Sequence, residues 1–347
     1  ARCRARDASP ARASPRLQPP AGCRRAAERT AGIVFDGLEP VTRTLRIEAP
    51  PREVWPWLVQ MGWGRGGWYS YDKLDMDQPS ADAILEEHAF SLELQDAEIS
   101  VVAPMVDARG NTLHEYDGFR FALFQRRGGH PPELDNFDNL LVLGRTLGRI
   151  HAVGRAGTFK ARQQITVERM LSQSREFLLE GFIPQSLVPA YSTLTSDLLQ
   201  TVSTIYAEVK PGDMIRVHGD CHVGNILWRD DTAHFVDLDD CCTAPAIQDL
   251  WMFLSGDRPY RQLQLAELIE GYSEFCDFDP RQLRWLEALR TLRITHYAAW
   301  LARRWSDPAF KIAFPWFDSR RYWDEHILAL REQVALMQEP PLEWLDF

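Results

Sequence analysis

The spacing of apolar residues changes several times along the 347-residue chain and divides it into segments. Residues 1–32 show no apolar periodicity, and we expect them to form a disordered leader. Residues 33–77 are strand-like and aromatic, and a short Pro/Gln connector ends this part at residue 79. The first quarter of the chain therefore differs in character from everything that follows.

A helix is predicted to start at Ser80, which has the side chain of an N-cap residue. Leu85, Ala89 and Leu92 then recur at helical spacing, which predicts that these three residues form the apolar face. Two strand-like runs follow, and turn-rich residues separate them; they occupy residues 99–106 and 119–125.

The rest of the chain is predominantly helical in pattern. The run after residue 138 places Leu140, Gly144, Leu147 and His151 on one face and ends at Gly154. Further helical patterns lie near 191–208, 246–255, 261–276, 280–305 and 320–337. A few strands, one helix, more strands and then a helical part with one hairpin predict a two-lobed α+β enzyme with a cleft between the lobes.

Composition narrows the class of protein. The chain is 45% hydrophobic and 25% charged, with a net charge of −10, and residues 1–30 carry eight arginines against two acids. The remainder is therefore strongly acidic, which argues against nucleic acid as a partner. The Arg/Ala-rich start resembles a transit peptide in composition, but its four prolines would break the amphipathic helix.

Six cysteines show no C-x-x-C pair, and no apolar run approaches 18 residues. The sequence predicts neither a zinc site, nor a disulfide framework, nor a membrane span. We expect a soluble, cytoplasmic protein and a monomer.

The chemistry-bearing stretch is residues 217–240, VHGDCHVGNILWRDDTAHFVDLDD. Asp220 lies in a His-Gly-Asp loop and Asn225 follows five residues later. A hairpin turned at Asp230-Asp231 would return Asp237 beside Asn225. Phosphoryl transfer from ATP needs a carboxylate to orient the attacking hydroxyl and oxygen ligands for Mg²⁺. Asp220 is thus the candidate base, and Asn225 and Asp237 are candidate magnesium ligands.

The specificity of this signal lies in the complete set. A single His-Gly-Asp would more often be an Asx turn, whereas H-G-D-x-H-x-x-N followed by a hairpin aspartate is rarely accidental. Asp239 and Asp240 are adjacent acids in a loop, a pattern that is usually only solvated.

Residues 218–228, HGDCHVGNILW, resemble the catalytic loop of the aminoglycoside phosphotransferase-like kinases. Within that superfamily they are most similar to the bacterial stress response kinases, which are serine/threonine protein kinases. The resemblance covers about residues 80–342 and includes the runs SADAILEEHAF, LGRTLGRIHAVGR, FVDLDD, PAIQDLWMFLSGD and WLARRWSDPAFKIAFPWF.

The resemblance implies roles for individual residues. Asp220 would be the proton acceptor, and Asn225 and Asp237 the magnesium ligands. Glu87 would be the helix glutamate that pairs with the ATP-binding lysine, and Asp249 would hydrogen-bond the backbone of the catalytic loop. By the same resemblance the fold is protein-kinase-like, with an incomplete N-lobe sheet, a remaining N-lobe over 80–128 and a C-lobe over 129–347.

One difference from activation-loop kinases follows from spacing. The metal aspartate stands in Asp237-Leu238-Asp239 instead of D-F-G, and only eleven residues separate Asp237 from Asp249. This interval is too short for a phosphorylatable activation segment, so we expect a kinase that is not switched by phosphorylation of that loop.

The resemblance fails upstream of the helix at 80–94. Residues 33–77 are instead similar to a fragment of the START-like polyketide cyclase/dehydrase superfamily, too short to close a sheet. Gly62–Gly67 satisfies G-x-G-x-x-G, and Lys73 is the only lysine before Glu87. The six residues from Gly67 to Lys73 are too few for two strands and a turn. We therefore expect Glu87 to have no lysine partner and ATP to bind poorly.

Four functions stay open at this point. The first is an ATP- and Mg²⁺-dependent serine/threonine protein kinase, and the second is a small-molecule kinase for an aminoglycoside or amino alcohol. The acidic cleft edge at Asp237, Asp239 and Asp240 favours a cationic acceptor of the second kind. The third is an inactive pseudokinase, and the fourth, a START-like lipid-binding module, fails on length.

Overall fold

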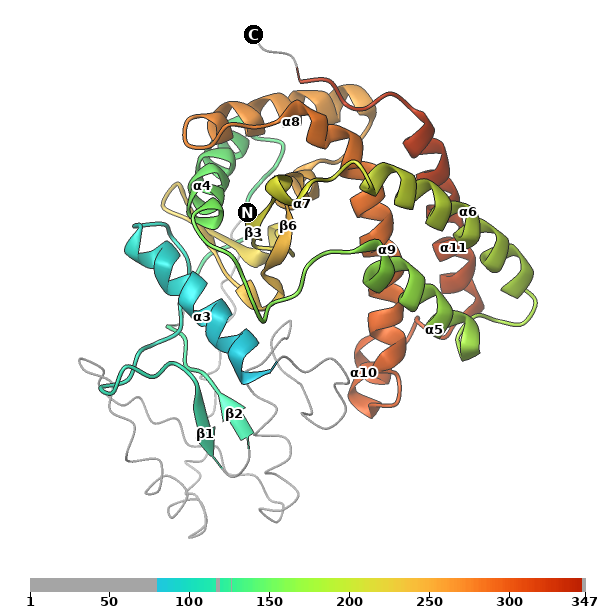
Figure 1. Ribbon diagram of the computed structural model, residues 1–347, viewed down its shortest axis with the longest axis horizontal. Coiled ribbons are helices and arrows are strands. Elements are labelled where there is room, and N and C mark those ends of the chain that lie inside the picture. The colour runs from blue at the N-terminus through green and yellow to red at the C-terminus, as the bar shows by residue number, and fades with distance from the viewer. Residues whose placement is uncertain (1–79, 117–118, 126, 345–347) are drawn as a thin grey trace, which may run out of the picture.

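The computed structural model describes residues 80–116, 119–125 and 127–344. The predicted leader, the START-like fragment at 33–79 and Lys73 lie outside the described residues. Figure 1 shows helix α3 (Ala81–Asp96) and the hairpin of β1 (His114–Tyr116) and β2 (Phe119–Phe121) on one side of a larger helical body. This arrangement agrees with the two-lobed α+β prediction.

Helix α3 begins where the sequence predicts, because the Ser80 hydroxyl accepts a hydrogen bond from the Ala83 N–H at 3.1 Å. The predicted apolar face is wrong. Leu85 is 44% exposed and Ala89 is exposed, whereas the buried side carries Ile84, Glu87 and Leu94, among others. Packing of the helix against the rest of the chain, not its local pattern, selects the buried face. This face includes the side chain of a glutamate, Glu87.

The strands near α3 are shorter than predicted. β1 and β2 pair antiparallel with Glu115 opposite Arg120, and β2 lies within the predicted run 119–125. The predicted strand at 99–106 is reduced to two single bridges, Val101 with Phe235 and Pro104 with Phe124. Pro104 has no N–H to donate to a continuous ladder, which accounts for part of the difference.

In the helical body, α4 (Phe137–Arg155) packs closely on α8 (Arg258–Ser273). The predicted face of α4 is confirmed, since all four of its residues are buried. Gly144 is required at this crossing, because a Cβ there would lie 2.1 Å from the Leu268 carbonyl oxygen. Gly271 of α8 has the reciprocal constraint against the Leu141 carbonyl, also at 2.1 Å.

Most of the other helices, though not the short α7, contribute to a second core, in which Tyr191, Phe317 and Trp323 are fully or almost fully buried. The sequence analysis missed α5 and α10. The helices are α5 (Gln173–Gly181), preceded by a π-helical turn at Glu168–Ser172, α6 (Val188–Tyr206), α7 (Ile247–Leu250), α9 (Leu286–Arg303), α10 (Pro308–Ala313) and α11 (Arg320–Gln338).

Two short antiparallel ladders lie within the larger body. β3 (Met214–Val217) pairs with β6 (Cys242–Pro245), and β4 (Ile226–Arg229) pairs with β5 (Thr232–Phe235). The predicted turn at Asp230-Asp231 is confirmed, and both residues have positive φ, as a type I′ hairpin turn requires.

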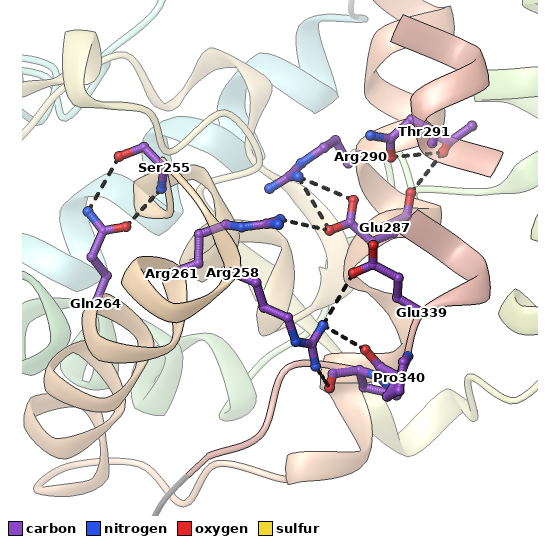
Figure 2. A network of polar contacts seen from close by, with 11 residues as sticks. Ser255, Arg258, Arg261, Gln264, Glu287, Arg290, Thr291, Glu339 and Pro340 are labelled. Carbon is purple, nitrogen blue, oxygen red and sulfur yellow. Dashed lines mark hydrogen bonds and ion pairs between the residues drawn. The ribbon is translucent and has the colours of Figure 1, made fainter. Parts of the chain in front are cut away.

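A network of arginines ties the C-terminal tail to the body (Figure 2). Arg258 of α8 donates to the carbonyls of Pro340 and Pro341 at 2.9 and 2.6 Å. Arg261 and Arg290 both pair with Glu287 of α9. These contacts join α8, α9 and the tail into one scaffold. Among the residues described, none of the helices has the length and apolar character needed to span a bilayer.

Candidate active site

The loop between β3 and β4, residues 218–225, carries the predicted catalytic motif. It starts beside β6, because Val217 pairs with Cys242. Gly219 has φ +86°, and a Cβ there would lie 2.2 Å from the Asp240 carbonyl oxygen. Only glycine fits this conformation and this contact, which explains the glycine of the His-Gly-Asp sequence.

Asp249 holds the start of this loop. Its carboxylate is fully buried and accepts hydrogen bonds from the backbone N–H groups of His218 at 2.8 Å and Gly219 at 2.9 Å. His151 Nε2 of α4 lies 3.0 Å from the same carboxylate. The expectation that Asp249 hydrogen-bonds the catalytic-loop backbone is therefore confirmed. Burial alone would raise the pKa of Asp249, but the hydrogen bond from His151, the electrostatic effect of His151 and His218 and the Gly219 N–H bring it below its ordinary value.

The other end of the loop is fixed to the β4–β5 hairpin. The N–H of Val236 donates to the Asn225 carbonyl at 3.0 Å, and His218 Nε2 lies 2.9 Å from the Val236 carbonyl. Asp237 follows directly in the left-handed conformation, with φ 64° and ψ 59°. The hairpin thus returns the chain beside the loop, and Asp237 directly follows Val236, the residue whose N–H is hydrogen-bonded to Asn225.

The three predicted polar residues lie in the loop and at the end of the hairpin. Asn225 is buried, and its Nδ2 donates to the Asp220 carbonyl at 2.9 Å, which leaves the Oδ1 atom as its acceptor. Asp237 is exposed. The Asp220 side chain is 19% exposed; its Oδ2 lies 3.6 Å from His222 Nε2, and its Oδ1 contacts the guanidinium of Arg293 on α9.

Glu87 of α3 lies within reach of the same region. Its side chain is 7% exposed and its Oε2 is 3.4 Å from Nη1 of Arg162, whose side chain is 6% exposed. Burial, together with the Asp239 carboxylate, raises the pKa of Glu87 to about 8, although Arg162 opposes the shift. Glu87 is therefore paired with an arginine, Arg162, a contact that the sequence analysis did not foresee. Lys73 lies outside the described residues, so its pairing with Glu87 and its part in binding ATP stay predictions.

Comparison with known proteins identifies the family of this chain. A family model described as the phosphotransferase enzyme family, APH, matches residues 73–286. The chain belongs to this family.

Two curated proteins are similar over most of this chain. Stress response kinase A of Escherichia coli O157:H7 is 44% identical over 76% of this chain and 80% of its own length. The serine/threonine protein kinase RdoA of Salmonella typhimurium strain LT2 is 42% identical over the same shares.

The fold is also similar to that of a solved kinase structure. A solved structure of amicoumacin kinase hAmiN, in complex with AMP-PNP, Ca²⁺ and Ami, aligns with a TM-score of 0.59 at 19% identity, over 77% of this chain and 80% of that one. The protein-kinase-like α+β fold class is thereby confirmed, and the chain is a phosphotransferase by family.

Sequence reasoning selected the candidate residues of the loop but missed two arginines that lie beside them. Arg162 and Arg293 stand far from residues 218–240 in the sequence, and neither lies in a motif. No local signal marks them, because each reaches the site only through the packing of another segment. Of the described cysteines, Cys221, Cys241, Cys242 and Cys276 are buried free thiols.

Proposed function

We propose that this phosphotransferase moves the γ-phosphoryl group of ATP, bound with Mg²⁺, to a serine or threonine hydroxyl of a protein. The observation that carries the proposal is the catalytic loop: Asp249 holds its first two backbone N–H groups, and the loop presents Asp220 and Asn225 beside the start of Asp237. Relatives named stress response kinase A and serine/threonine protein kinase, at 42–44% identity, favour a protein acceptor.

Asp220 would orient the attacking hydroxyl and accept its proton. Its Oδ1 is held by Arg293, so Oδ2 is the oxygen that can face the acceptor. Arg293 thereby restricts the rotation of the carboxylate. Pre-orientation of this kind is where a kinase gains most of its rate, because phosphoryl transfer depends on positioning.

The donor set fits a magnesium ion bound together with nucleotide phosphates. An amide oxygen of Asn225 and a carboxylate oxygen of Asp237 are the hard ligands that Mg²⁺ prefers. Among the described residues no group of three His, Cys, Asp or Glu side chains could hold a metal by itself. This fits an ion that takes its remaining ligands from phosphates and water. When bound, Mg²⁺ would neutralise charge on the β- and γ-phosphates.

The acidic cleft edge was the argument for a cationic small-molecule acceptor. Two arginines partly neutralise the negative charge of this edge. Arg293 contacts the Asp220 carboxylate, and Arg162 and Arg293 both interact electrostatically with Asp240. A second cation brought to Asp220 would be repelled by Arg293. We therefore favour a hydroxyl acceptor without a neighbouring ammonium group.

The first experiment is a pair of substitutions with purified protein. Asp220→Asn should abolish phosphoryl transfer and leave ATP affinity nearly unchanged, whereas Asp237→Ala should remove Mg²⁺-dependent nucleotide binding. Asp231→Asn is the matched control, because it removes a carboxylate in the hairpin turn where asparagine also tolerates the positive φ of 53°. Loss of ATP binding in Asp220→Asn, or loss of turnover in the control, would contradict the assignment.

The acceptor is tested separately with labelled ATP. Generic protein substrates should be labelled on serine or threonine, and a panel of aminoglycosides and amino alcohols should not. Efficient labelling of a small amine with none on protein would replace the protein-kinase proposal by the small-molecule one.

A further inference from the structure

The side chain of Arg162 joins two parts of the candidate active site. It lies in the segment that follows α4, and its Nε donates to the Cys241 carbonyl at 2.8 Å. Its Nη2 donates to the Asp239 carbonyl, and its Nη1 lies 3.4 Å from Glu87 Oε2 on α3. One guanidinium thus contacts helix α3 and both ends of the Asp239–Cys241 backbone.

The backbone that carries Arg162 is itself fixed from both sides. The Glu86 carboxylate of α3 accepts hydrogen bonds from the N–H groups of Lys160, Ala161 and Arg162 at 2.7, 2.8 and 2.8 Å. A few residues on, the segment pairs with β6, because the N–H of Thr243 donates to the Gln163 carbonyl at 2.9 Å and the N–H of Ile165 donates to the Thr243 carbonyl at 3.0 Å. Arg162 therefore has little freedom to move away from the loop.

Resting on the proposed function, we propose that Arg162 is a positioning residue that clamps the loop from Asp237 to Cys241 against α3. The loop begins at a candidate magnesium ligand, and Arg162 holds the carbonyls two and four residues beyond it. Clamping those carbonyls restricts where the Asp237 carboxylate can lie.

The clamp does permanently what a phosphorylated activation segment does in switchable kinases, which is to keep the metal loop and the neighbouring helix in place. The short interval between Asp237 and Asp249 leaves no such segment here. A planar guanidinium suits this role, because it offers five N–H donors in a fixed fork, whereas the ammonium of lysine is a point charge on a flexible stem.

The test compares Arg162→Met and Arg162→Lys with Arg175→Met. Arg175 is the matched control, because it also makes several hydrogen bonds, to Thr195, Ser192 and Ser196 of α6, and none of them is to the loop. The first readout is amide hydrogen exchange in metal-free protein. Arg162→Met should speed exchange across residues 238–242, including the Cys241 amide that donates to Leu238, by about tenfold or more, and Arg175→Met should not.

The second readout is the Mg²⁺ concentration that gives half-maximal nucleotide binding. Arg162→Met should raise it roughly 10- to 100-fold, as is typical when the support of a metal ligand is removed. Arg162→Lys should recover only part of this loss, and Arg175→Met should leave the Mg²⁺ concentration unchanged.

The outcomes separate the two proposals. Unchanged exchange at residues 238–242, or a uniform increase over the whole chain that Arg175→Met reproduces, would overturn the clamp. A wild-type protein without Mg²⁺-dependent nucleotide binding would overturn the proposed function, and the exchange result would still decide the clamp.

Discussion

Replacing Asp249 tests how strongly the catalytic loop depends on one buried carboxylate. Asp249→Ala removes the acceptor for two backbone N–H groups and for His151, all of them buried. Asp249→Asn keeps the shape of the side chain. Its one carbonyl oxygen can replace only one of the two carboxylate oxygens as a hydrogen-bond acceptor. The amide NH₂ group takes the place of the other oxygen and faces an N–H donor, with which it forms no hydrogen bond.

The magnitudes follow from the number of donors left without an acceptor. Each buried donor that loses its partner costs about 1–3 kcal/mol. For Asp249→Asn one such donor predicts a loss of about 2 kcal/mol in the free energy of unfolding. For Asp249→Ala three donors predict about 3–9 kcal/mol, and the lower part of this range matches the ~3–5 kcal/mol that is typical when one partner of a buried pair is removed. Either loss is large against a total of about 5–15 kcal/mol.

Activity should fall further than stability. The N–H groups of His218 and Gly219 immediately precede Asp220, so a shift of about 1 Å in the loop should slow turnover on the order of 100-fold, even where the protein is folded. Unfolding in urea and phosphoryl transfer at a permissive temperature measure the two effects. Leu330→Ala is the control, because Leu330 is fully buried in the second core and its truncation should cost a similar ~2–5 kcal/mol without touching the loop.

The pH dependence has a definite sign. Because the folded pKa of Asp249 lies below its ordinary value of 3.8, its contribution to stability is fully present above that value and is lost as pH falls through the lower folded pKa. The stability difference between wild type and Asp249→Asn should therefore shrink below about pH 4. Equal turnover in Asp249→Asn and Leu330→Ala at equal folded fraction would refute the reasoning.

Three further predictions concern other elements. Gly144→Ala should destabilise by about 1–3 kcal/mol or more, because its Cβ would lie 2.1 Å from the Leu268 carbonyl, and urea unfolding measures this. The pKa of Glu87 is raised to about 8 by burial and Asp239. The contribution of this side chain to the free energy of unfolding is therefore fully present below pH 4.5 and is lost as the pH rises through 8. The Tm of Glu87→Gln, measured in EDTA, should therefore rise relative to the Tm of wild type as the pH increases between those values. A Tm difference that does not change with pH would contradict this. Asp231→Gly should raise stability by up to about 1 kcal/mol, because glycine adopts the φ of 53° without strain, and an unchanged or lower urea midpoint would count against it.

The sequence by itself determined the parts of this protein that depend on neighbouring residues. The Ser80 cap, the buried face of α4 and the loop that carries Asp220 and Asn225 are all set by short-range spacing and by backbone hydrogen bonding. The return of Asp237 belongs with them, since a two-residue turn at Asp230-Asp231 leaves the hairpin one register. These features could be predicted because few chain conformations satisfy them.

Only the tertiary structure decided which distant side chains complete the site. The sequence indicates that Glu87 lies in a helix, but the buried face of that helix and the pairing with Arg162 depend on how α3 packs on the segment after α4. Arg293 reaches Asp220 because α9 crosses beside the loop. A guanidinium can be supplied from many positions in a chain, and local spacing does not restrict which one arrives. Packing selects it, since a buried carboxylate needs a partner wherever the fold can provide one.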